Sequence, residues 1–397
     1  MYRKLRSISL VFVGFIIGVS ASLNGREPFP NHHLPLFADI LDSIERYYVK
    51  PIPKSQLVDA AIKGMLTELD DYSEYQTPQQ ISQQQANNNG QYYGFGFEVN
   101  QQGEHITITD VFANSPAEQA GIAQGDKIIG VNERVLSSEN RLALMSEIRQ
   151  AADQKQPLSL TLRTDSHQKR QISLQPKLIS IPAVTASIID DNIGYIKLNG
   201  FQKKSYLHVK ATLIKWQDES LIGLIIDLRN NPGGLLQQAI KVADLFIPQG
   251  VIVSTKGRFA EANSKYSASP LSLFNQLPML VLIDKHSASA AEVLAAALQQ
   301  NHRATLMGET SFGKGSIQGM IPTLNPSNQL KLTIANYLTP KGDNIHDRGI
   351  TPDILISPVP ANRAEFQIKK ASVDASLLKQ HNDMVINQAI NWIKDQT

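Results

Sequence analysis

The sequence contains no cysteine among its 397 residues. Disulfide bonds, thiolate metal sites, a cysteine nucleophile and a lipid anchor on an N-terminal cysteine are therefore excluded. An excess of charge is also lacking, because 38 Lys and Arg residues are balanced by 36 Asp and Glu residues. A protein that binds nucleic acid by electrostatic attraction carries a much larger basic excess, so nucleic acid is not an expected partner.

Long apolar runs are missing apart from a short one near the start. Residues 8–19 are largely apolar, follow a basic start (MYRKLR) and lead into the small residues 19–21 (VSA). This pattern predicts a secretory signal peptide, and the run is short for a bilayer-spanning helix, which needs about 20 residues. We expect residues 1–22 to be a signal peptide or a membrane anchor. The rest would then be extracytoplasmic, either periplasmic or anchored to the outer face of the cytoplasmic membrane.

Helical and strand patterns divide the remaining chain into four expected parts. Residues 23–90 carry apolar residues at helical spacing and end in a polar stretch, residues 83–90, that is typical of a linker. Residues 91–178 alternate like short strands between glycine-containing turns, which predicts a β-rich domain. Residues 179–360 alternate strands with helices, which predicts an α/β core with a substantial parallel component, and residues 361–397 contain a last helix.

A turn with two glycines opens the β-rich part. In such a turn, successive backbone N–H groups can point into one concavity that binds a carboxylate, and the adjoining strand edge can pair with an extended peptide. Taken alone, a Gly-x-Gly pattern is more often only a turn. The residues that we expect at such a peptide-binding groove are Gly94, Phe95, Gly96 and Phe97.

Ser289 follows an apolar segment, residues 279–283, and opens an alanine-rich helix. With Glu292 it forms the pattern of a capping box, and this structural interpretation is favoured when the segment is taken alone. The same position places a serine hydroxyl beside free backbone N–H groups. The Ala290 amide could therefore stabilise an oxyanion formed by attack of Ser289.

Residues 312–318 (FGKGSIQ) shift the balance toward catalysis. They follow the strand after the Ser289 helix, so Lys314 can reach the same end of the sheet. A lysine serves as general base only when neutral, and burial can lower its pKa from about 10.4 toward ~7. Gln318 could orient the amine without adding a charge. The start of a P-loop pattern is also present, but Gly315 replaces the magnesium-binding Ser or Thr, so nucleotide binding is disfavoured.

A further glycine turn, residues 227–234 (DLRNNPGG), ends an apolar strand pattern. Ligands of open α/β sheets bind at this end of a strand, and the exposed amides could supply a second oxyanion donor; a plain turn is the alternative. The histidines do not fit a Ser-His-Asp triad, since His286 precedes Ser289 too closely and lies outside its helix. No histidine pattern shows metal-site spacing, so we expect no metal.

Together these segments resemble the carboxy-terminal processing peptidases, also called tail-specific proteases. The order of the motifs and the interval from Ser289 to Lys314 are those of the family. Ala291 departs from it, since many members have a second serine there, but none of the expected roles depends on it. The matching segments are residues 69–75 (LDDYSEY), the β-rich part, which resembles a PDZ domain, and residues 227–234, 287–292 (SASAAE), 312–318 and 337–353.

The resemblance implies a multidomain α/β protein with a mixed α/β protease core (crotonase- and ClpP-like), an inserted PDZ domain and N- and C-terminal helices. It also implies a serine endopeptidase of the cell envelope that cleaves proteins near their C-termini without metal or cofactor. Substrate tails are its expected partners, and Leu142 and Met145 are expected at the apolar pocket of its PDZ domain. A homodimer, an activating adaptor and membrane anchoring are compatible with it. The implied catalytic residues are Ser289 as nucleophile, Lys314 as base, Gln318 as its orienting residue, and the amides of Ala290 and Gly233, with Gly234 less favoured, as oxyanion hole.

Two other functions stay open at the level of the sequence. A catalytically silent PDZ adaptor that binds protein C-termini would keep the fold. The presence of Ser289, Lys314 and Gln318 speaks against it, because a scaffold has no need to place a lysine beside a serine. An acyl-handling hydrolase on a crotonase-like core would have no use for a peptide-binding module.

Overall fold

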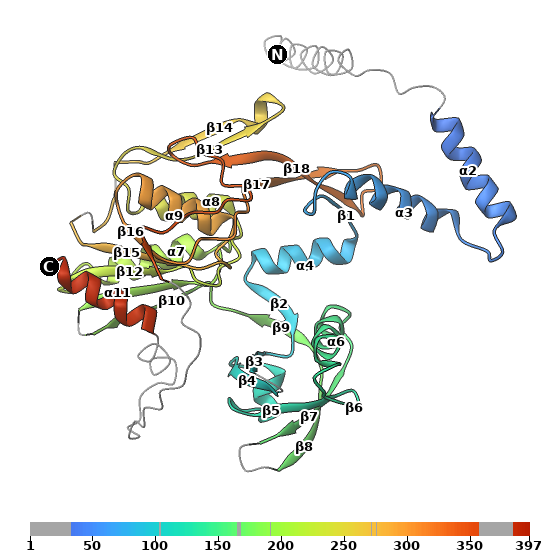
Figure 1. Ribbon diagram of the computed structural model, residues 1–397, viewed down its shortest axis with the longest axis horizontal. Coiled ribbons are helices and arrows are strands. Elements are labelled where there is room, and N and C mark those ends of the chain that lie inside the picture. The colour runs from blue at the N-terminus through green and yellow to red at the C-terminus, as the bar shows by residue number, and fades with distance from the viewer. Residues whose placement is uncertain are drawn as a thin grey trace, which may run out of the picture. The chain divides into compact units, whose positions relative to one another are not determined.

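The computed structural model describes residues 33–102, 105–164, 168–190, 192–270, 272–274, 276–356 and 384–397 (Figure 1). By its internal contacts the chain divides into two units, Met1–Asp71 and Tyr72–Thr397. The expected signal peptide or anchor, residues 1–22, lies outside the described residues. Within the described ranges, none of the helices combines the length and the apolar character that a membrane crossing needs.

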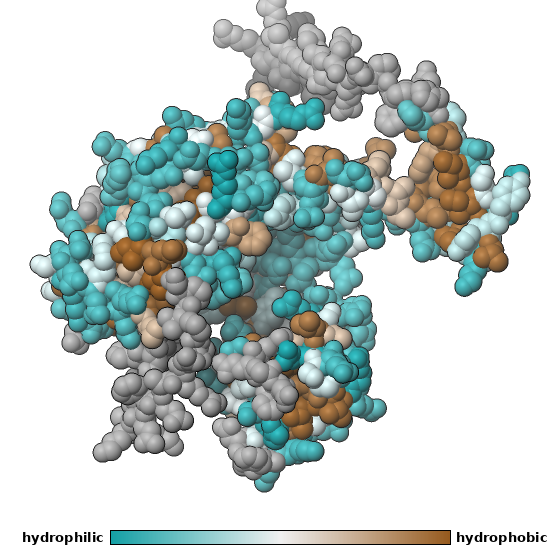
Figure 2. All heavy atoms as spheres, in the orientation of Figure 1, coloured by the Kyte–Doolittle hydropathy of each residue, from teal (hydrophilic) through white to brown (hydrophobic). Residues whose placement is uncertain are grey.

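The smaller unit is described over two helices, α2 (His33–Tyr47) and α3 (Lys54–Thr67), where helical spacing predicted them. Lys54 Nζ lies 2.8 Å from Asp42 and 2.9 Å from Glu45, so ion pairs connect the two helices. None of the α2 side chains is buried, and Figure 2 shows an apolar surface on this unit. The exposed apolar side chains of α2 include Leu34, Leu36, Phe37 and Ile40.

A six-stranded sheet forms the centre of the larger unit. Its strands are β10 (Val184–Ile189), β11 (Ile193–Leu198), β12 (Gly223–Asp227), β15 (Met279–Ile283), β16 (Thr305–Gly308) and β19 (Ile354–Leu355). They lie in this order across the sheet, and all neighbours are parallel except β10 and β11. Both β12 and β15 are buried over their whole length, as their unbroken apolar sequences predict.

Helices cover both faces of this sheet (Figure 1). They are α7 (Ser205–Lys215), α8 (Leu236–Asp244), α9 (Ala290–Gln300) and α11 (Met384–Asp395). Leu224 and Ile226 of β12 pack in the core with α7, α8 and α9, whereas Ile225 packs with α11 on the other face. Successive strand residues point to opposite faces, so one apolar strand stabilises both layers. The mixed α/β fold class is confirmed.

A second, antiparallel sheet was not predicted from the sequence. Its strands are β1 (Glu74–Gln76), β18 (Gln329–Leu338), β13 (Val251–Gly257) and β14 (Ser264–Ser267), with β17 (Ser316–Pro322) also paired to β18. Most of β18 is only half-buried, so its sequence lacks the unbroken apolar run of β12. Pairing between segments far apart in the chain defines this sheet, and local patterns do not report such pairing.

The β-rich part forms its own core between two paired strands, β2 (Gln91–Gly94) and β9 (Lys177–Ser180). Because these strands are neighbours, the segment between them begins and ends at one place, as an inserted domain requires. The elements of this part are β3 (Phe97–Gln102), β4 (His105–Val111), α5 (Pro116–Gln119), β5 (Lys127–Val131), β6 (Arg134–Val135), α6 (Arg141–Asp153), β7 (Leu158–Arg163) and β8 (Lys169–Leu174).

The linker expected at residues 83–90 is wrong, because α4 (Pro78–Asn88) covers most of it. Thr77 and Gln80 form a capping box: the Gln80 N–H donates to the Thr77 hydroxyl, and the Thr77 N–H donates to Gln80 Oε1 at 2.9 Å. A capped first turn followed by glutamines propagates a helix even where composition is polar. Composition alone therefore misled the interpretation.

Candidate active site

Ser289 is the N-cap residue of α9 and follows β15 through a short loop. Its backbone has φ 55° and ψ −115°, in the positive-φ region that a non-glycine residue enters only at a cost of about 1–3 kcal/mol. Such strain is typical of functional positions, where the surrounding structure holds it. Nearby, the buried Ser287 hydroxyl donates to Leu228 O at 2.8 Å and so fixes this loop against the one after β12.

Gly233, in the loop after β12, lies directly beside the turn that carries Ser289. A Cβ atom at Gly233 would come 2.9 Å from Ser289 Cβ and 3.0 Å from the Ala290 nitrogen. Only glycine fits this approach, and its φ of 101° also favours glycine. The structure thus brings together Ser289, Ala290 and Gly233, which the sequence placed in two separate motifs.

Of the two amides expected in the oxyanion hole, one is engaged. The Gly233 N–H donates to Asn231 Oδ1 at 2.8 Å, and Asn231 Nδ2 donates to Leu198 O. The Ala290 amide belongs to the first turn of α9, where backbone N–H groups have no partner within the helix. In this arrangement the Gly233 N–H is therefore occupied by Asn231, whereas the Ala290 N–H has no acceptor within its helix.

Glu292 connects the Ser289 and Lys314 segments, and the sequence indicated only part of its contacts. Its fully buried carboxylate accepts from the Ser289 N–H at 2.7 Å and the Lys314 N–H at 2.9 Å through Oε2. Through Oε1 it accepts from the Ser311 hydroxyl and the Gly313 N–H, both at 2.6 Å. The capping-box pattern indicated only its contact with Ser289. The other three partners come from a loop distant in sequence.

Lys314 lies on the loop between β16 and β17, and its Nζ stands 4.4 Å from the ring centroid of Tyr72. Gln318 lies on β17 after a register shift in its pairing with β18. The Gln318 amide nitrogen donates to Ser316 Oγ at 3.0 Å and to Thr333 Oγ1 at 3.1 Å. The side-chain oxygen of Gln318 is then the atom that can accept a hydrogen bond from an amine.

Tyr337 adds a hydroxyl that the sequence did not single out as part of the site. Its phenol lies beside the Ser289 side chain, and its N–H donates to Gly315 O at 2.7 Å. The residue is 5% exposed, and burial, together with the Glu292 charge, raises the pKa of Tyr337 despite the Ser289 contact. The phenol is therefore neutral at physiological pH and able to donate to the serine oxygen.

A buried ion pair fixes the base of the Gly233 loop. Arg229 donates to both carboxylate oxygens of Asp227, at 3.0 and 2.6 Å, and Tyr195 donates to Oδ2 at 2.7 Å. Burial alone would raise the pKa of Asp227, but the hydrogen bonds and charge of Arg229, with Lys197 and Tyr195, outweigh it and lower this pKa. The carboxylate stays charged and holds the loop in place.

A groove in the β-rich part matches most of the expected peptide-binding residues. β3 is an edge strand of its sheet, and a cavity of about 450 Å³ lies beside it. A Cβ at Gly96 would collide with Ser115, so the glycine turn is tightly packed. Expected residues that line the cavity are Gly94, Phe95, Gly96, Phe97 and Met145; residues added by the structure include Ile148, Arg149 and Ala152.

Leu142 is a correction to the predicted groove. Its side chain is 74% exposed and does not line the cavity. It shares a helical face with Met145 but belongs to the first turn of α6, beyond the end of the groove. Periodicity reports the face of a helix but not how far along it a groove extends.

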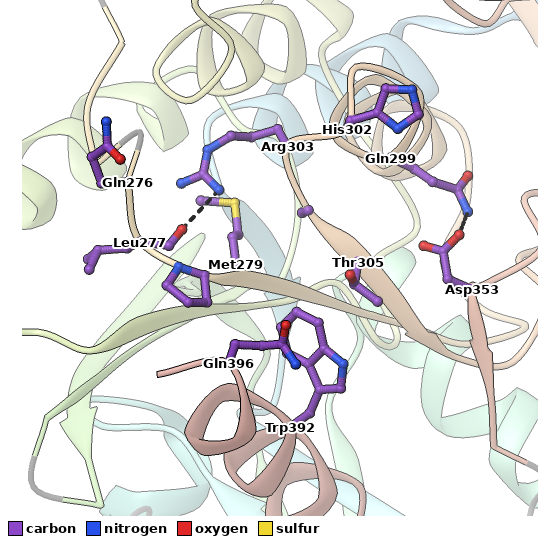
Figure 3. A pocket seen from close by; sticks show the side chains of 12 residues that line it. Gln276, Leu277, Met279, Gln299, His302, Arg303, Thr305, Asp353, Trp392 and Gln396 are labelled. Atoms are coloured by element: carbon purple, nitrogen blue, oxygen red, sulfur yellow. Dashed lines mark hydrogen bonds between the residues drawn. The ribbon is translucent and has the colours of Figure 1, made fainter.

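A separate cavity of about 440 Å³ lies at the other end of the central strands (Figure 3). Met279 and Thr305, the first residues of β15 and β16, line it, whereas Ser289 follows the C-terminal end of β15. Arg303 donates to Phe274 O and Leu277 O here, and burial lowers its pKa to about 10. We assign this arginine to bracing the loop before β15.

Comparisons with known proteins agree with the geometry. Residues 192–356 match peptidase family S41, and residues 82–163 match the PDZ domain. A carboxy-terminal-processing protease of Bartonella bacilliformis is 36% identical over 341 residues, which cover 84% of this chain and 78% of that protein. A carboxyl-terminal-processing protease of Synechocystis is 35% identical over 322 residues, covering 79% and 74%.

The fold is also found among solved structures. The photosystem II D1 C-terminal processing protease superposes with a TM-score of 0.52 at 24% identity, covering 81% of this chain and 92% of that one. This structural similarity shows the fold, whereas the family is shown by the relatives that are similar in sequence.

Proposed function

Because the chain belongs to the carboxy-terminal-processing proteases of peptidase family S41 and is a serine-type peptidase, we propose that Ser289 and Lys314 form its catalytic dyad. The observation that carries this proposal is the Glu292 carboxylate, which binds the backbone N–H groups of both residues. A carboxylate shared in this way holds the two segments at a fixed distance. Strain at Ser289 and the close approach of Gly233 support the same assignment.

In the proposed reaction, Ser289 Oγ attacks the scissile carbonyl carbon while its proton passes to neutral Lys314 Nζ. The Ala290 N–H stabilises the oxyanion, and the Gly233 N–H joins it by leaving Asn231 when substrate enters. The lysine then returns the proton to the departing amine as the C–N bond breaks. Water attacks the acyl-enzyme in the second half, giving the new carboxyl end and the free serine.

Gln318 is proposed to orient the base. With its nitrogen bound to Ser316 and Thr333, its oxygen is left to accept from Lys314 Nζ. A neutral amide directs the amine without the charge of a carboxylate, which would raise the pKa of the lysine.

Substrates are proposed to be protein tails of the cell envelope, bound by the PDZ groove. The edge of β3 can pair with an extended peptide, and Phe95, Met145 and Ile148 offer an apolar site for its last side chain. Export follows from the apolar run at residues 8–19, and a homodimer or an activating adaptor is compatible with this arrangement.

The test compares cleavage of an unfolded protein with an apolar C-terminus by the wild type, Ser289→Ala and Lys314→Ala. Either substitution should lower the rate by at least about 10³-fold with folding intact, as measured by circular dichroism. Ser327→Ala and Lys285→Ala, at exposed positions, are matched controls and should keep full activity.

Two results would change the assignment. Cleavage that survives both active-site substitutions would show that the dyad is wrong. A wild type that binds the tail without cleaving it would favour the adaptor.

A further inference from the structure

One family motif, residues 69–75, has no task in the mechanism above. Its Tyr72 presents a ring to Lys314, with 4.4 Å between Nζ and the ring centroid. A cation within ~6 Å of an aromatic face is attracted by the ring quadrupole. We propose that Tyr72 is a positioning residue for the general base: its ring holds the Lys314 amine and stabilises the ammonium formed when Lys314 takes the Ser289 proton. This inference rests on the proposed dyad.

The backbone next to Tyr72 is held on the same sheet as the lysine loop. Ser73 Oγ accepts from the Thr333 N–H of β18 at 3.1 Å, and β1 pairs with β18 immediately afterwards. On its other side β18 pairs with β17, which starts at Ser316, just after the lysine. One strand therefore sets the positions of both Tyr72 and Lys314, although they are far apart in sequence.

His346 completes the surroundings of the ring. Its imidazole meets the Tyr72 ring edge-to-face, with 6.4 Å between centroids and an interplanar angle of 63°. A ring fixed on one edge presents its face in one orientation, which is what a positioning role needs. The titratable and charged side chains on the segments packed against the lysine loop are Tyr72, Glu292, Tyr337, His346, Asp347 and Arg348.

The ring acts differently on the two forms of the lysine. It attracts the ammonium far more than the neutral amine, so its contribution grows as the proton arrives from Ser289. An interaction that is stronger in the transition state than in the ground state raises kcat. Because the ring favours the ammonium over the neutral amine, we expect the acid limb of the activity profile to lie at higher pH than it would without the ring.

The experiment measures kcat and kcat/KM against pH for Tyr72→Leu and Tyr72→Phe, with melting temperatures as a folding check. Leucine removes the quadrupole, so we expect the acid limb to move about half a pH unit lower and the plateau kcat to fall about 2- to 5-fold. Phenylalanine keeps the ring and should reproduce the wild-type profile. Tyr72→Trp should move the acid limb of the pH–activity profile to higher pH. This variant tests the proposal if Tyr72→Leu does not fold.

Two outcomes would overturn the inference. If Tyr72→Phe behaves like Tyr72→Leu, the hydroxyl and not the ring matters. If Tyr72→Leu lowers only the melting temperature or kcat while the limb stays in place, the residue is merely structural. Failure of the dyad itself is a separate result, since it would appear as activity in Lys314→Ala.

Discussion

The Gly233 backbone approaches Ser289 so closely, across two loops that are far apart in the sequence, that the space between them does not admit a Cβ atom. No side chain larger than hydrogen fits at Gly233 unless the serine moves, because a Cβ would stand 2.7 Å from Ala288 O and 2.9 Å from Ser289 Cβ. The loop after β12 and the turn that carries Ser289 are therefore closely fitted to each other.

Gly233→Ala should reduce kcat by about 10²-fold or more, the scale of losing an oxyanion-hole donor, because it displaces the turn that carries Ser289. Gly342→Ala is the matched control: Gly342 also has a positive φ, of 89°, but nothing lies within 4 Å of a Cβ there. It should cost only backbone strain, about 1 kcal/mol, and keep activity. Equal losses of activity in both variants would contradict the steric argument. Steady-state kinetics and thermal melting measure the two effects.

Tyr337→Phe should remove the phenol hydroxyl beside Ser289 while keeping the packing of the ring. We expect kcat to fall about 10-fold with KM little changed, since a hydrogen bond to a reacting group contributes about 1.5 kcal/mol. Labelling of Ser289 by a fluorophosphonate should slow in parallel. Tyr266→Phe on β14 makes the same change away from Ser289 and should leave kcat and the labelling rate unaltered. If kcat and the labelling rate are also unaltered in Tyr337→Phe, the Tyr337 hydroxyl does not assist Ser289.

Asp227 should make the protein sensitive to acid. Its pKa is lowered in the folded state, so its stabilising contribution is present above the unfolded value of about 3.9 and is lost as pH falls through the folded pKa. Asp227→Asn leaves the Arg229 charge without its partner and should destabilise by about 3 kcal/mol near pH 7. The difference from the wild type should shrink below about pH 4.

Denaturant unfolding at several pH values tests this expectation, and Asp218→Asn at an exposed position is the control. A difference from the wild type that stays constant from pH 7 to pH 2 would show that the charge of Asp227 is not responsible.

Met145→Asp should weaken binding of an apolar C-terminal peptide at least about 10-fold, because it places a charge in the apolar groove. Leu142→Asp is the matched control three residues earlier on the same helix, with an exposed side chain outside the cavity. Its affinity should equal that of the wild type. Titration with a fluorescent peptide measures the affinities of the two variants. If Leu142→Asp lowers the affinity as much as Met145→Asp does, Leu142 belongs to the groove as the sequence predicted.

The sequence by itself determined several of the helices and strands, and its motifs pointed to the residues that we propose as the reacting groups. β15 and α9 have the bounds that the apolar run and the alanine-rich helix predict, and Thr77 with Gln80 starts a helix through its own side chains. These features depend on interactions over a few residues, which local sequence contains. The family motifs then placed Ser289 and Lys314 in order along the chain.

Tertiary structure alone decided how those groups meet. Three contacts follow from pairing between distant strands and loops: Glu292 binds the backbone of both Ser289 and Lys314, Gly233 donates to Asn231, and Tyr72 lies over Lys314. The same holds for Leu142, whose helical face was evident but whose distance from the groove was not. Local periodicity specifies which way a side chain points. Only packing of the whole chain specifies what it points at.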